Sequence, residues 1–122
     1  MPKVMVIDDE PFILMMIEDK LKKGGFDVLT SRQSKGAVDI IRKEMPDLII
    51  LDWMMPEVSG IEICKELKSD KDLSTIPIFM LTAKGQEDDE KLGLMSGVDR
   101  YITKPFSPKL LLEMVKAVFS GS

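Results

Sequence analysis

The sequence predicts an α/β fold in which one parallel β-sheet is covered by helices on both faces. Five short apolar runs alternate with stretches of helical period along all 122 residues, and such alternation favours a parallel sheet with right-handed crossovers. The third run, residues 47–51, is almost wholly apolar, as a strand covered on both faces should be. The length fits one domain, which we place at residues 1–119. Residues 120–122 form a tail that is either the start of a linker or a cloning scar.

The first strand and the first helix have clear boundary residues. The strand covers residues 3–7, and Pro11 stands where a helix can begin. Apolar residues then recur about every 3.6 positions until Gly24 and Gly25 end the helix. These apolar positions are Ile13, Leu14, Ile17 and Leu21. Residues 26–30 form a short second strand.

Two further helices flank the third strand. Ser34 is suited to cap the second helix, which Pro46 closes, and Ser59 with Gly60 begins the third. The apolar positions of these helices are Ala37, Val38, Ile40 and Ile41 in the second and Ile61, Ile63, Cys64 and Leu67 in the third. Each set repeats with the helical period, which indicates packing against the sheet.

The second half of the chain continues the alternation. Residues 76–81 form the fourth strand, a polar helix covers about 86–96, and residues 98–103 form the fifth strand. Ser107 caps the last helix, of which Pro108 is the first residue. Five strands and five helices are therefore expected.

Four of the strands end on polar residues suited to phosphoryl chemistry. The first strand runs into Asp8 and Asp9, and the third runs into Asp52. The fourth ends on Thr82, and the fifth ends on Lys104. Parallel strands open their carboxyl ends on one edge of the sheet, where open α/β sheets bind ligands. A single strand-end Asp is most often a turn or cap residue, but the joint pattern favours a site for a divalent cation and a phosphoryl group.

The three carboxylates require a counter-charge. Asp8, Asp9 and Asp52 cannot all stay ionised at close range unless a cation balances them, because each negative charge raises the pKa of the others. Mg²⁺ suits this role, since it prefers a few carboxylates together with water and phosphate oxygens. Asp52 lies in the middle of the cluster and is the candidate nucleophile toward phosphorus. Lys104 can pair with one phosphoryl oxygen, and the Thr82 hydroxyl can donate to another.

The composition narrows the classes of function. A net charge of −4 argues against nucleic-acid binding by this domain, and no apolar run approaches the ~20 residues of a membrane helix. The chain has no histidine, which excludes Ser-His and Cys-His catalysis and a histidine relay of phosphate. Cys64 is the single cysteine, so no internal disulfide can form, and a reducing cytoplasm is the expected location.

Four segments carry a resemblance to a known family. They are Ile7–Pro11, Asp47–Pro56, Pro77–Ala83 and Tyr101–Phe106. These segments resemble the motifs of response-regulator receiver domains of two-component signalling, and the resemblance extends over nearly the whole chain. It implies a flavodoxin-like, doubly wound sheet with the strand order 2-1-3-4-5.

The resemblance also implies roles for the residues of the site. A sensor kinase's phosphohistidine, or a small phosphodonor, phosphorylates Asp52. Asp9 holds Mg²⁺ directly and Asp8 largely through water. Asp52 and the backbone carbonyl of Met54 complete the protein ligands.

For the switch, the resemblance implies that Thr82 moves toward bound phosphate and that Tyr101 rotates inward behind it. The face formed by the fourth helix, the fifth strand and the last helix then changes and serves as the output surface for a downstream effector. The resemblance further implies a cis peptide bond between Lys104 and Pro105.

Two apolar features leave alternatives open. Leu110 and Met114 lie four residues apart on the last helix. They form either a surface for self-association on phosphorylation or a row that packs against the preceding helix. Phe12 and Met15 on the first helix are interpreted as core residues. The alternative is an apolar ridge beside the site, on which a kinase helix lies.

The leading hypothesis is a phosphorylation-switched signalling domain that is no enzyme apart from assisting its own phosphorylation and dephosphorylation. Its expected partner is a sensor histidine kinase or a phosphotransfer protein. One alternative is a Mg²⁺-dependent phosphatase with an aspartyl nucleophile, but the haloacid-dehalogenase type needs a second acid where Met54 stands. A second alternative is an interaction module that works without phosphorylation, although every switch residue is in place.

Overall fold

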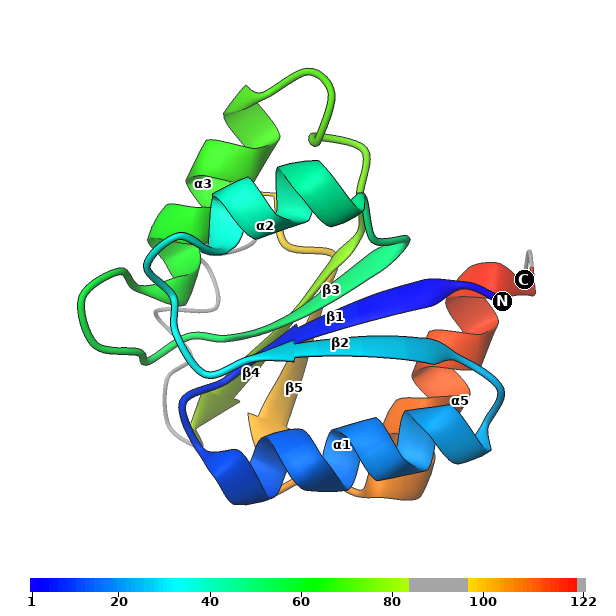
Figure 1. Ribbon diagram of the computed structural model, residues 1–122. Helices are drawn as coiled ribbons and strands as arrows, with labels where there is room; N and C mark the ends of the chain where they lie inside the picture. Colours follow the sequence, from blue (N-terminus) through cyan, green and yellow to red (C-terminus); the bar gives the residue numbers. More distant parts are fainter. Residues whose placement is uncertain (84–96, 121–122) are drawn as a thin grey trace.

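The computed structural model describes residues 1–83 and 97–120, and these form a five-stranded parallel sheet between two layers of helices (Figure 1). The strands stand in the order β2-β1-β3-β4-β5, which confirms the predicted order. In sequence they are β1 Lys3–Ile7, β2 Asp27–Ser31, β3 Leu48–Asp52, β4 Ile78–Ala83 and β5 Arg100–Lys104. The helices among the described residues are α1 Pro11–Lys23, α2 Ala37–Glu44, α3 Gly60–Ser69 and α5 Pro108–Phe119. The helix predicted over about 86–96 lies outside the described residues.

The sheet separates two apolar cores. Figure 1 shows α2 and α3 on one face of the sheet and α1 and α5 on the other. Successive residues of a strand point to opposite faces, so Met5 and Ile7 of β1 join the core under α2 and α3, whereas Val4 and Val6 join the other. All five residues of β3 are buried, as the apolar run predicts for a strand between two neighbours and two helical layers.

The helices begin and end largely where the boundary residues predict. Pro11 is the first residue of α1, and Gly25 follows its end with a φ of 96°. The Ser59 side chain accepts a hydrogen bond from the Glu62 N–H, and the Glu62 carboxylate accepts one from the Ser59 N–H, which makes a capping box for α3. At α5 the Ser107 side chain accepts from the Leu110 N–H.

The predicted cap of α2 is wrong. The helix begins at Ala37, after Gly36 in the left-handed region with a φ of 81°. The Ser34 hydroxyl instead donates to the Pro56 carbonyl at 2.9 Å, in the loop between β3 and α3. Because the Ser34 hydroxyl is hydrogen-bonded to this distant loop, it does not cap the free N–H groups in the first turn of α2.

The interpretation of Phe12 and Met15 as core residues is also wrong. Their exposed fractions are 68% and 61%. The inward stripe of α1 is already filled by the fully or nearly buried Leu14, Ile17 and Leu21. Phe12 and Met15 therefore lie on the solvent side of the helix. No helix in the described part of the chain has the length and apolar character needed to cross a membrane.

Candidate functional site

The predicted site residues meet at the carboxyl edge of the sheet. Asp8 and Asp9 directly follow β1, Asp52 ends β3, and Lys104 ends β5. In the sheet register Asp52 pairs with Leu81, so Thr82 lies one position further along β4. Asp8, Asp52 and Thr82 are buried, with exposed fractions of 0%, 5% and 1%. Buried polar side chains of this kind, at one sheet edge, indicate a binding site.

The three carboxylates form a cluster that fits a divalent cation. Asp8, Asp9 and Asp52 each offer one oxygen, and these oxygens all lie within 4.8 Å of one another. Such a set of hard oxygen donors suits Mg²⁺ or another hard cation. The structure therefore supports a metal-binding acidic cluster at the predicted place.

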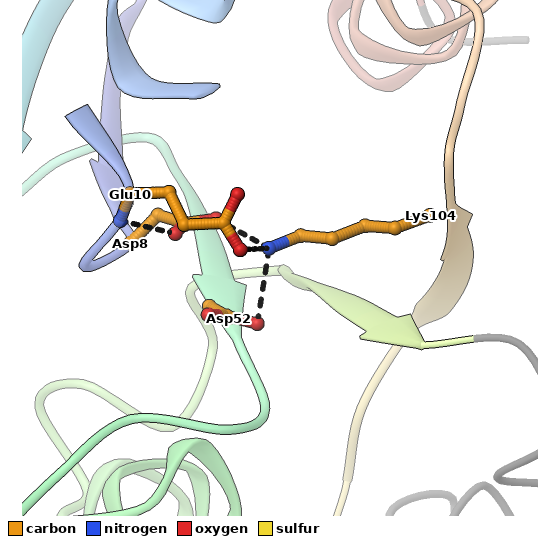
Figure 2. Close-up of polar contacts among 4 residues, drawn as sticks. All are labelled: Asp8, Glu10, Asp52 and Lys104. Atoms are coloured by element: carbon orange, nitrogen blue, oxygen red, sulfur yellow. Dashed lines mark hydrogen bonds and ion pairs between the residues drawn. The ribbon is translucent and has the colours of Figure 1, made fainter. Parts of the chain in front are cut away.

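Lys104 provides the positive charge within this cluster. Figure 2 shows its side chain reaching from β5 toward three carboxylates. The Lys104 Nζ lies 2.9 Å from Asp8 Oδ2, 3.4 Å from Asp52 Oδ1 and 3.6 Å from Glu10 Oε1. Glu10 also donates its backbone N–H to Asp8 Oδ1 at 2.9 Å. Glu10 was not among the predicted site residues, although it is the third acid in a run of three.

The surroundings of Asp52 favour its neutral form. Burial raises the pKa of Asp52 to about 7, and the charge of Asp8 adds to this, while Lys104 works in the opposite direction. At Lys104 burial opposes the charged form, but the hydrogen bond to Asp8 and the charges of Asp52, Asp8 and Glu10 outweigh it and raise the pKa of Lys104. Lys104 therefore stays protonated, and a further positive charge near Asp52 would favour the ionised carboxylate.

Thr82 offers a hydrogen-bonding group that the described residues leave unused. Its Oγ1 is buried and has no hydrogen-bond partner within residues 1–83 and 97–120. A buried hydroxyl is nearly always paired in a folded protein. An unpaired one at the sheet edge fits a ligand oxygen, as a phosphoryl group would supply.

The remaining predicted residues lie on the flanks of the site. Met54 is two residues beyond Asp52, and its side chain is 63% exposed. Tyr101 is half-buried, and its ring centroid lies 6.3 Å from that of Trp53. The peptide bond between Lys104 and Pro105 is cis.

Gly60 brings α3 against the backbone that carries Asp52. Its N–H donates to the Trp53 carbonyl at 2.9 Å. A Cβ at this position would lie 2.3 Å from the Asp52 carbonyl oxygen and 3.0 Å from the Trp53 Cα. Only glycine leaves room for this approach of helix to strand end.

Comparisons with known proteins agree with this geometry. A family model described as the response regulator receiver domain matches residues 4–116. The alkaline phosphatase synthesis transcriptional regulatory protein PhoP of Bacillus subtilis is 44% identical over 98% of this chain and 49% of its own length. The phosphate regulon transcriptional regulatory protein PhoB of Pseudomonas aeruginosa is 47% identical over 94% of this chain and 50% of its own. The chain thus spans about half the length of these curated relatives.

Solved structures give the same result. The receiver domain of the Francisella response regulator 1452 has a TM-score of 0.89 and 35% identity, covering 99% of this chain and 98% of that one. The chemotaxis protein CheY4 of Vibrio cholerae has a TM-score of 0.89 and 30% identity, covering 97% and 98%. These chains share the fold of the protein described above.

Proposed function

Because this chain belongs to the response regulator receiver domain family, we propose that it is the phosphorylation-activated receiver of a two-component system. In this proposal Asp52 accepts a phosphoryl group from the phosphohistidine of a sensor kinase or from a small phosphodonor. The observation that carries the proposal is the buried Asp52 carboxylate, which lies among Asp8, Asp9 and the ammonium of Lys104.

The cation of the site is proposed to be Mg²⁺. The carboxylates of Asp9 and Asp52 and the backbone carbonyl of Met54 would hold it directly, and Asp8 would hold it largely through water. When bound, it supplies positive charge that favours the ionised form of Asp52 and neutralises phosphoryl oxygens. An Asp52 carboxylate oxygen forms the new bond to phosphorus, while the bond from phosphorus to the donor's leaving group breaks. The electron pair of that bond goes to the imidazole nitrogen of the histidine donor or, with an acyl phosphate donor, to an oxygen of the carboxylate that leaves.

Lys104 and Thr82 are proposed to hold the product. The Lys104 ammonium lies 3.4 Å from Asp52 Oδ1 and can follow the negative charge onto a phosphoryl oxygen. The unused Thr82 hydroxyl can donate to a second oxygen. The domain then acts catalytically only in assisting its own phosphorylation and dephosphorylation.

The proposed switch follows from these two contacts. Movement of Thr82 toward the phosphoryl group opens space behind it, and the Tyr101 ring turns into that space. The surface formed by β5 and α5, together with the stretch before β5, then changes. On that surface Leu110 is 55% exposed, whereas Met114 is half-buried. We propose this face as the output surface, with phosphorylation-dependent self-association through Leu110 as one consequence.

Partners and setting are proposed from the relatives. Both regulators reported above are named as transcriptional regulatory proteins and are about twice as long as this chain. A sensor histidine kinase upstream and a DNA-binding effector downstream are therefore proposed. We place the receiver at residues 1–119 with a tail at 120–122, without nucleic-acid binding of its own, and in the cytoplasm.

Acetyl phosphate labelling tests the proposal. Intact-protein mass spectrometry should show one added phosphoryl group on the wild type with Mg²⁺ and none after chelation. Asp52→Asn should not be labelled, whereas Asp47→Asn, which removes an exposed acid just before the same strand, should behave as the wild type. Labelling of Asp52→Asn at another residue would contradict the assignment.

The labelling, together with an assay of phosphomonoester hydrolysis, separates the two alternatives. A phosphatase would turn over phosphomonoesters many times, and the exposed apolar Met54 offers it no second acid. A module that works without phosphorylation would show no labelling at all. Both outcomes differ from the single, Mg²⁺-dependent modification expected here.

A further inference from the structure

The loop between β3 and α3 contains a strained turn. Glu57 has a φ of 71°, in the left-handed region that side-chain-bearing residues avoid. The Val58 N–H donates to the Pro56 carbonyl at 2.9 Å, so the hydrogen bond closes around Glu57 alone. A γ-turn with a positive φ at its centre is rare and strained. Such a conformation persists only where the surroundings hold it in place.

The Ser34 hydroxyl holds this turn from both sides. It donates to the Pro56 carbonyl at 2.9 Å and accepts a hydrogen bond from the Val58 N–H at 3.2 Å. Ser34 is buried, with an exposed fraction of 5%. The two contacts bridge 22 and 24 positions of the chain and join the loop after β2 to the loop after β3.

The clamped turn lies between two fixed points of the site. On one side is Asp52, the last residue of β3, followed at once by Trp53 and Met54. On the other side is Gly60, whose N–H donates to the Trp53 carbonyl and which packs against the Asp52 backbone. The backbone of residues 54–59 is thus fixed at one end by Asp52 in β3 and at the other end by Gly60 in α3. Ser34 fixes it between these two points.

We propose that Ser34 is a positioning residue for the cation site: its hydroxyl fixes the strained turn at Glu57 and thereby aims the Met54 carbonyl at the carboxylate cluster. This inference rests on the proposed function, in which that carbonyl is a metal ligand. Without the hydroxyl, Glu57 relaxes toward negative φ and the Met54 carbonyl leaves its position. A glycine at position 57 would adopt the same φ without strain and would make the clamp unnecessary.

Mg²⁺ titration followed by the fluorescence of Trp53, the single tryptophan, provides the test. Ser34→Ala should bind Mg²⁺ at least about tenfold more weakly than the wild type, since loss of a group that orients a metal ligand typically costs about 10- to 100-fold in affinity. Ser31→Ala is the matched control, because within residues 1–83 and 97–120 the Ser31 hydroxyl makes its hydrogen bonds to the backbone of Gln33, in its own turn. Ser34→Ala with Glu57→Gly should regain wild-type affinity, and Glu57→Gly alone should keep it.

A second measurement, hydrogen exchange of the Val58 amide, uses the metal-free wild type. It therefore does not depend on bound metal or on how well a variant folds. In the metal-free wild type, the Val58 amide should be protected from hydrogen exchange, because it donates to two acceptors. Exchange at the rate of an unstructured peptide would overturn the clamp.

The outcomes separate this inference from the proposed function. If the wild type binds Mg²⁺ and accepts phosphate but Ser34→Ala binds Mg²⁺ equally well, the positioning role is wrong and the function stands. If the double variant binds as weakly as Ser34→Ala, strain at Glu57 is not the reason and the inference fails. If the wild type binds no Mg²⁺, the proposed function and this inference fail together.

Discussion

Replacing Asp52 with asparagine should stabilise the metal-free protein, and the stabilisation should grow with pH. The pKa of Asp52 is raised from 3.8 to about 7 by burial and by the charge of Asp8. The folded state therefore holds this proton more tightly than the unfolded chain does. As pH rises from the unfolded pKa to the folded one, ionising Asp52 costs an increasing part of the folding free energy, and above the folded pKa the cost is constant. Asparagine has no such cost.

The raised pKa sets the size of the effect. A shift of about 3 units corresponds to a ceiling of about 4 kcal/mol at about 1.36 kcal/mol per unit. Applied between about pH 5 and about pH 8, the linkage relation predicts that the advantage of Asp52→Asn grows by about 2.5 kcal/mol. The chain has no histidine, so no side chain with an ordinary pKa titrates in the middle of this window.

Urea unfolding of both proteins in chelator at the two pH values measures the difference. Asp27→Asn, which removes an exposed acid on the edge strand away from the site, is the matched control. Saturating Mg²⁺ should shrink the advantage of Asp52→Asn, since the cation stabilises the ionised wild type. An advantage that is equal at both pH values would refute the view that Asp52 is held neutral by its surroundings.

Three further predictions concern single residues. Gly60→Ala should lose about 1–3 kcal/mol of unfolding free energy in urea, because the added Cβ would lie 2.3 Å from the Asp52 carbonyl oxygen; unchanged stability would show that the helix shifts freely. Lys104→Ala should still accept phosphate but lose the NMR shifts of β5 that accompany it, and a full wild-type response would exclude its coupling role. Leu110→Glu should abolish any self-association of the beryllofluoride-activated protein in sedimentation, whereas a monomeric wild type would exclude association through this residue.

The sheet and the acidic site could be predicted because local patterns determine them. Apolar runs identify the strands, and in a parallel sheet the residues that follow each strand meet at one edge. Asp52 and Lys104 required no knowledge of packing. Parallel strands place both residues at one edge of the sheet, whereas their contact at 3.4 Å also depends on the strand order, which the family resemblance supplied.

Features that depend on distant contacts could not be predicted in this way. Ser34 carries the local signature of a helix cap, and only the folded chain brings it to Pro56, 22 positions away. From the sequence, Phe12 and Met15 could lie on either the core side or the solvent side of α1. The structure shows that Leu14, Ile17 and Leu21 are the buried residues of this helix. In the sequence, nothing distinguishes Glu10 from other acidic residues. It becomes part of the site because the fold brings Lys104, near the other end of the chain, beside it.

A crystal structure with Mg²⁺ and beryllofluoride would test the central claim most directly. The account predicts beryllium on an Asp52 carboxylate oxygen, with Mg²⁺ between Asp9, Asp52 and the Met54 carbonyl. It also predicts that the Lys104 Nζ and Thr82 Oγ1 donate to fluorine atoms, so that Lys104 leaves its 2.9 Å contact with Asp8. Beryllofluoride on another residue, or Lys104 still paired with Asp8 beside an occupied Asp52, would contradict it.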